Sequence, residues 1–335
     1  MDADPYDGRV LTLKRKRGLA ERSSWVSKTI RSPIWFEDGN IVIQAEDIQY
    51  KMYKGLLATY SPFFKDVFGV PQPTADDAKA VEGCAVINLP ESAEDVSYML
   101  GFILEPKSST LLPSLASVVA SLKMAHKYLI AALWDDAVAR LRYEFPDRLE
   151  NYQKTRTGTS VDHSYTRIRL LPLESTQHLV EVVREMGLQR ILPALYLHIA
   201  DKFNLDVLTE GGRTTGRLTG TSLETRITLL NGRAKLLGAY IAQLRLAASE
   251  PSPRCLDSRR CAVARAELRD IYFARAENAN IRYLRFWDSE DISTDWSHSM
   301  MCPLCAEAMR ATRKRGQQEV WNTLPLLFGL PAWGS

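Results

Sequence analysis

The spacing of apolar residues changes from two to three or four near residue 53, and this change most constrains how the chain can fold. In residues 48–52 (IQYKM) apolar and polar side chains alternate, which is typical of a β-strand with one buried face. Residues 41–45 (IVIQA) precede this run, and only the pair Glu46-Asp47 separates the two, so they are predicted to form a β-hairpin. From Leu56 onward apolar residues recur at helical spacing. The chain is therefore predicted to pack helices against a small sheet.

Capping residues indicate where the next elements begin. Ser61 followed by Pro62 is predicted to separate two short helices, because Ser is a good N-cap and Pro fits the first helical position. Residues 86–89 (VINL) are a further strand candidate, and Ser92 opens a capping-box pattern before an amphipathic helix. The expected order is a strand at 34–36, the hairpin, two short helices, a strand and three helices that continue to Leu141.

Several segments in this order resemble the BTB/POZ domains of large fungal protein families. They are residues 34–45 (IWFEDGNIVIQA), 50–54 (YKMYK), 57–68 (LATYSPFFKDVF), 86–90 (VINLP) and 125–130 (AHKYLI). Tyr53 stands where that family usually has His, so the resemblance does not imply the charged pocket of the best-studied BTB repressors. It implies an α+β BTB/POZ-like module over residues 33–143, with a small sheet packed against helices.

The second half of the chain is predicted to be mostly α-helical. Phe145-Pro146 and the polar stretch 151–164 mark a boundary, so residues 144–335 form a separate helical region with a cysteine-containing end. Residues 187–196 and 321–333 also resemble the middle and the ending of the fungal BTB proteins. One helix has apolar residues at alternating steps of three and four: Ile227, Leu230, Ala234, Leu237, Ile241 and Leu244. This seam fits either a core helix of an all-α domain or a short coiled-coil dimer.

Composition indicates where in the cell the protein is expected and which classes of partner it can bind. The 335 residues carry 43 Lys plus Arg and 40 Asp plus Glu, and the net charge of +3 gives no overall field that would attract nucleic acid. No apolar run is long enough to span a bilayer, and residues 1–8 do not resemble a secretory signal, so an intracellular protein with no membrane partner is expected. Residues 1–32 are predicted to be a disordered tail. Within it Lys14, Arg15, Lys16 and Arg17 form either a nuclear import signal or a solvated charge run, which leaves nucleus or cytoplasm open.

Searches for catalytic motifs find no Gly-x-Ser-x-Gly elbow, His-Glu-x-x-His, P-loop or Gly-x-Gly-x-x-Gly. The glycine-rich stretch 208–222 lacks the lysine and the spacing of a P-loop. No catalytic residue and no small-molecule substrate are therefore assigned, and the protein is predicted not to be an enzyme.

Cysteine spacing gives the one predicted ligand site. Cys302 and Cys305 form a Cys-x-x-Cys knuckle, the spacing that lets two thiolates hold one tetrahedral metal ion. Cys255 and Cys261 lie upstream with five residues between them, which is more than the usual two to four, and His298 is an alternative ligand. The four cysteines are predicted to bind one structural zinc ion, with ordinary buried thiols or a disulfide as the alternatives.

These observations favour a non-enzymatic module for protein–protein interaction, acting by self-association as a homodimer or by docking protein partners. BTB resemblance also implies an adaptor of a cullin-type ubiquitin ligase, in which the second half would hold the substrate. An unrecognised enzyme is the third hypothesis.

Overall fold

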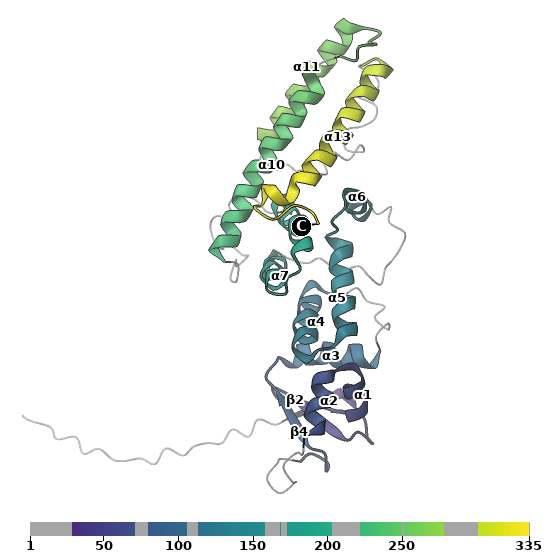
Figure 1. Cartoon of the computed structure of the whole chain (residues 1–335), viewed down its shortest axis with the longest axis vertical. Helices are drawn as coiled ribbons and strands as arrows, with labels where there is room; N and C mark the ends of the chain where they lie inside the picture. Colours follow the sequence, from purple (N-terminus) through teal and green to yellow (C-terminus); the bar gives the residue numbers. More distant parts are fainter. Residues whose placement is uncertain are drawn as a thin grey trace, which may run out of the picture.

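The computed structural model describes residues 29–70, 80–105, 113–157, 168, 173–202, 222–249, 251–277 and 301–334. The molecule is elongated, with a small sheet at one end (Figure 1). At the other end lie the long helices α10 (Leu223–Ser249), α11 (Ser258–Glu277) and α13 (Pro303–Leu327), which we call the helical arm. The basic cluster at Lys14–Arg17 lies outside the described residues.

Four strands form the sheet: β1 (Ile30–Trp35), β2 (Ile41–Ala45), β3 (Ile48–Met52) and β4 (Val86–Leu89). Their order is β1-β3-β2-β4, in which β2 and β3 form the predicted antiparallel hairpin and the outer strands pair in parallel with their neighbours. The strand β1 begins earlier than expected, because Ile30 already pairs with Ile48. Residues 30–32 therefore belong to the sheet and not to the predicted tail.

The helices of the first half follow in the predicted order. They are α1 (Lys54–Tyr60), α2 (Pro62–Gly69), α3 (Ala93–Leu104), α4 (Leu115–Tyr128) and α5 (Ala131–Glu144). Ser61 caps α2 as the sequence predicts, since its Oγ accepts a hydrogen bond from the backbone N–H of Phe64 at 3.1 Å. The α+β class is thus confirmed, with helices packed against one small sheet.

One expectation for the sheet is wrong, because β3 is buried on both faces and not on one. Lys51 is only 4% exposed, although it alternates with the apolar residues of the strand. Its Nζ donates to the backbone carbonyl of Glu37 at 2.7 Å and pairs with the Glu82 carboxylate at 2.9 Å, while Trp35 lies within cation–π distance. These partners compensate the buried charge and cover the face of β3 that carries Lys51.

A carboxylate fastens α4 to the segment before α3. Glu91 pairs with Lys127, and its second oxygen accepts a hydrogen bond from the Tyr128 hydroxyl at 2.5 Å. Partial burial opposes ionisation of Glu91, but the hydrogen bonds from Lys127 and Tyr128 outweigh it, and the pKa of Glu91 is lowered. Burial and the same carboxylate raise the pKa of Tyr128.

The regular secondary structure described in the second half is helical. Before the arm come α6 (Leu149–Thr157), α7 (Leu173–Glu185), the 3-10 turn η2 (Gln189–Ile191) and α8 (Leu192–Lys202). Two buried apolar cores run through the molecule, and α4 and α5 contribute to both. Leu115 and Val118 of α4 enter the larger helical core, whereas Met124 and Tyr128 enter the core beneath the sheet. The predicted units 33–143 and 144–335 are therefore joined through shared helices. Of the described helices, none is long and apolar enough to cross a membrane.

The buried face of α10 overlaps the predicted seam only in part, because Leu230, Leu237 and Ile241 are half-buried against the core. Leu229, Leu236 and Tyr240 are at most 2% exposed, whereas Ile227 of the seam is 49% exposed. This face lies inside the chain's own helical core, because α10 packs against α8, α11 and α13. Arg233 is buried on it and donates to the Ala200 carbonyl at 3.1 Å. The structure thus describes α10 as a core helix.

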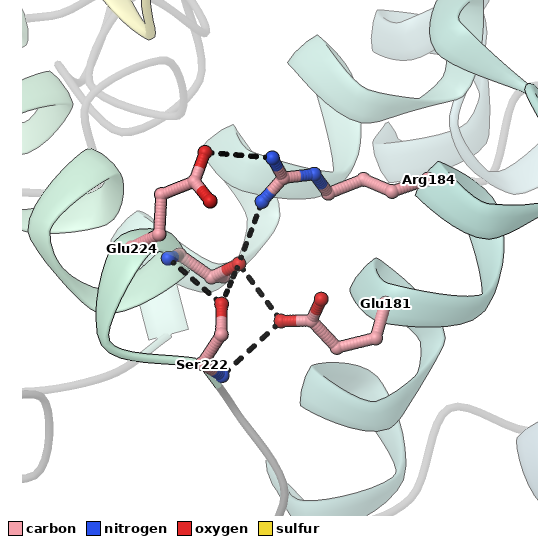
Figure 2. Close-up of polar contacts among 5 residues, drawn as sticks. Glu181, Arg184, Ser222 and Glu224 are labelled. Atoms are coloured by element: carbon pink, nitrogen blue, oxygen red, sulfur yellow. Dashed lines mark hydrogen bonds and ion pairs between the residues drawn. The ribbon is translucent and has the colours of Figure 1, made fainter.

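A polar cluster fixes the start of α10 against α7 (Figure 2). Glu181 accepts hydrogen bonds from the Ser222 backbone at 3.2 Å and from the Thr225 hydroxyl at 2.8 Å. Arg184 donates to Thr225 Oγ1 at 3.2 Å and pairs with Glu224 at 2.8 Å. Burial opposes the charge on Glu181, but the hydrogen bonds from Thr225 and Ser222 outweigh it and lower the pKa of its carboxyl. The start of α10 is therefore held against α7 by hydrogen bonds and an ion pair.

Candidate metal centre

The four predicted cysteine ligands come from two segments that start the last two helices of the arm. Cys255 lies in the turn before α11, and Cys261 lies in the early turns of that helix. Cys302 is the N-cap of α13, and Cys305 lies in its first turn. The two pairs are far apart in the sequence, with 41 residues from Cys261 to Cys302 and 47 residues from Cys255 to Cys302.

Folding brings all four sulfurs together. The Sγ atoms of Cys255, Cys261, Cys302 and Cys305 lie within 4.8 Å of one another. The Cys255 and Cys302 sulfurs are 3.9 Å apart, and Cys261 and Cys305 are completely buried. All five cysteines of the chain are free thiols, so the cluster contains no disulfide. The cluster is compatible with a tetrahedral zinc site.

Local sequence explains why the helices begin at the cysteines. Asp257 caps α11, since its Oδ1 accepts from the backbone N–H of Arg260 at 3.0 Å and its carbonyl accepts from Cys261 N–H at 3.0 Å. Pro303 occupies the first position of α13, where no backbone donor is needed. The positive ends of two helix dipoles thus lie at the sulfurs, and a helix N-terminus stabilises a nearby thiolate.

Backbone donors also reach the sulfurs directly. The N–H of Cys302 donates to the Cys261 sulfur at 3.2 Å. Backbone hydrogen bonds from Leu256 and Cys305 lower the pKa of the Cys302 thiol to about 6. Loss of hydration, followed by a hydrogen bond with Cys305, raises the pKa of Cys255 to about 12. Of these two thiols Cys302 therefore ionises first, whereas Cys255 keeps its proton at neutral pH unless a metal ion displaces it.

Of the remaining candidates, the fifth cysteine does not join the site. Cys84 is buried in the sheet unit, where its sulfur donates to the Gly39 carbonyl at 3.3 Å. His298, the alternative ligand, lies outside the described residues. Sequence reasoning identified all four clustered cysteines but missed Arg265, which is buried on α11 one turn after Cys261. Its polar residue type gave no signal, because burial of an arginine is decided by the helices around it.

Comparison with known proteins adds no relative: no family model, no curated protein and no solved structure matches the chain.

Proposed function

We propose that this chain is a non-enzymatic scaffold for protein–protein interaction, and that one structural zinc ion fastens its helical arm. The observation that carries the zinc proposal is the convergence of four cysteine sulfurs within 4.8 Å, from two segments distant in sequence. Zn–S bonds of about 2.3 Å in a tetrahedron separate the sulfurs by about 3.8 Å. The Cys255–Cys302 separation of 3.9 Å is close to this value.

A Cys₄ shell indicates a structural role for the metal. Four thiolates complete the tetrahedron and leave no open position at which zinc could activate water. The ion would join the turn before α11 to the first turn of α13. Since both helices already pack against α10, the three helices of the arm would then be linked to one another. Because zinc would bind the cluster only in the folded chain, its binding would stabilise the fold by mass action.

Zinc analysis of the full chain tests the site. Protein purified without chelator should contain about one equivalent of zinc per chain, as expected for a closed structural site. Cys305→Ser should lose most of this metal, whereas Cys84→Ser is the matched control and should keep it, because Cys84 lies in the sheet unit. Less than about a tenth of an equivalent in the unmodified chain would refute the proposal, whatever the variants do.

The interaction proposal is supported by a cleft at the outer strand of the sheet. This cleft of about 510 Å³ lies between β1, β3 and the start of α3, and its lining includes Ile30, Ile48 and Tyr98. Ile30 and Tyr98 are exposed, so apolar surface is available beside a sheet edge. An extended segment of a protein partner could pair with such an edge through its backbone while its side chains enter the cleft. We propose that the BTB/POZ-like unit docks partners or a second copy here.

Light scattering after size-exclusion chromatography, together with affinity capture from native cells, tests this surface. Ile30→Asp should abolish dimerisation or the recovery of partners. Leu223→Asp changes an apolar residue that is 68% exposed on the arm, so it is the control and should leave both unchanged. A strictly monomeric protein with no recoverable partner would contradict the proposal. Capture of a cullin at micromolar protein would specify the ligase-adaptor form, and its absence would remove that form alone.

A further inference from the structure

The helical arm contains a largely buried arginine, Arg265, for which no ion pair is found among the described residues. Arg265 of α11 is 4% exposed, and its Nε is buried with no hydrogen-bond partner. Its neighbours along the helix are different, because Arg259, Arg260 and Arg269 are exposed to solvent. Arg269 also pairs with Asp270 at 3.1 Å. A charge removed from water is stable only when an opposite charge or hydrogen bonds compensate it.

The position of Arg265 relates it to the cysteine cluster. It lies four residues after Cys261, and both belong to the one face of α11 that is buried, together with Ala264 and Leu268. Residues four apart are neighbours on a helix surface, and helical side chains lean toward the N-terminus. The Cα–Cβ bond of Arg265 is therefore inclined toward the turn of α11 that carries Cys261.

The charge of the cluster depends on what it binds. A protonated thiol is neutral, so without a metal ion the cluster offers the guanidinium less negative charge than four thiolates would. Four thiolates around one divalent ion carry a net charge of −2, because metal binding requires the cysteines to lose their protons. A dianion at the start of α11 is the counter-charge that a buried cation on the same face requires.

We propose that Arg265 is the counter-cation of the metal centre, and that the cysteines bind a divalent, thiophilic ion as a complete tetrathiolate. This inference rests on the proposed zinc site. Arg265 acts as a positioning residue, since it offsets the charge of the bound centre and supplies no ligand. Partners beyond the ligands commonly tune metal affinity by about tenfold to a hundredfold.

Metal affinity and its pH dependence test the role. Zinc affinity should be measured on the full chain by competition with a chromophoric chelator, for the unmodified protein, Arg265→Met, Arg265→Lys and the control Arg269→Met. Arg265→Met removes the charge but keeps a long side chain, so zinc affinity should fall about tenfold to a hundredfold. The pH at which half the zinc is lost should rise in this variant, because its thiolates have lost a neighbouring cation. Arg265→Lys and Arg269→Met should both keep that pH close to the unmodified value.

A second measurement needs no variant that removes the charge. The Nε–H resonance of Arg265, assigned by its absence in Arg265→Lys, should shift when zinc or cadmium is titrated into the metal-free protein. An unshifted resonance, or Arg265→Met with zinc affinity within about twofold of the unmodified chain, would overturn the role of Arg265 while the zinc site stands. Failure of the unmodified chain to bind zinc would instead overturn the site itself.

Discussion

Replacement of Gly232 by alanine should destabilise the arm, although glycine is a poor helix former. Gly232 is buried in α10, and a Cβ at this position would lie 2.1 Å from Cδ1 and 2.2 Å from Cε1 of the Phe328 ring. Phe328 follows the last turn of α13 and is buried. Its ring packs against Tyr196 of α8 with centroids 5.2 Å apart. The ring therefore has a buried neighbour that limits its retreat from a new methyl group.

Two effects of opposite sign determine the magnitude. Alanine is favoured over glycine inside a helix by about 1 kcal/mol. Carbon atoms pack no closer than about 3.5 Å, so the ring or α10 would have to shift by more than an ångström, and overpacking of a core costs about 1–3 kcal/mol. Because this overlap is severe, we take the upper end of that range, and Gly232→Ala should lower the free energy of unfolding by about 2 kcal/mol.

Gly238 provides the control in the same helix. It is exposed, and a Cβ there would meet no atom within 4 Å. Gly238→Ala should therefore raise the free energy of unfolding by about 0.5–1 kcal/mol. Urea unfolding followed by far-ultraviolet circular dichroism, with equal m-values required, gives both differences. A Gly232→Ala protein as stable as the unmodified chain, or more stable, would refute this account of the α10–Phe328 contact.

Three further predictions concern other contacts of the fold. Since the pKa of Glu91 is lowered in the folded state, its contribution to stability is present above the ordinary glutamate pKa and is lost as pH falls through the folded value. Glu91→Gln should consequently be less stable than the unmodified chain at neutral pH, with the difference shrinking in an acid titration followed by circular dichroism. Leu229→Ala should lower the free energy of unfolding in urea by about 2–5 kcal/mol, because Leu229 is buried. Ile227→Ala alters the exposed side of α10 and should lower it by less than about 1 kcal/mol. Equal losses in the two variants would favour the coiled-coil seam. Thr225→Val should lower the free energy of unfolding by about 1–3 kcal/mol, because it leaves the half-buried Glu181 carboxylate without its closest hydrogen-bond donor. If carbon NMR finds the pKa of Glu181 unchanged in this variant, the prediction is contradicted.

Local spacing in the sequence was sufficient to predict most elements. The alternation in residues 48–52 and the short break at Glu46-Asp47 predicted the β2–β3 hairpin, and Ser61-Pro62 predicted the boundary between α1 and α2. These features depend on neighbouring residues only, since backbone period and capping act over three or four positions. Cys302 and Cys305 were recognised for the same reason, because a knuckle is a local motif.

Features that depend on neighbours distant in sequence were not predicted correctly or were left open. The burial of Lys51 required Trp35 and Glu82 to close over a strand that was expected to have a polar face. The helices around α10 bury Leu229 and Tyr240 most deeply, whereas the predicted seam is covered only in part. Leu230, Leu237 and Ile241 of the seam pack against the core, and Ile227 is exposed. A periodic pattern identifies an amphipathic helix, but helices packed on several sides bury residues that the pattern leaves outside.

The candidate metal site depends both on local sequence motifs and on packing between distant segments. The sequence by itself determined the residue type of each ligand and the spacing within each cysteine pair. Only the tertiary structure decided that the pairs meet, because α11 and α13 both pack on α10 with their first turns at one place. It also decided that Arg265 is buried on the face that carries Cys261. The physical reason is that the chemistry of a ligand belongs to its side chain, whereas convergence and burial are properties of the packing between segments.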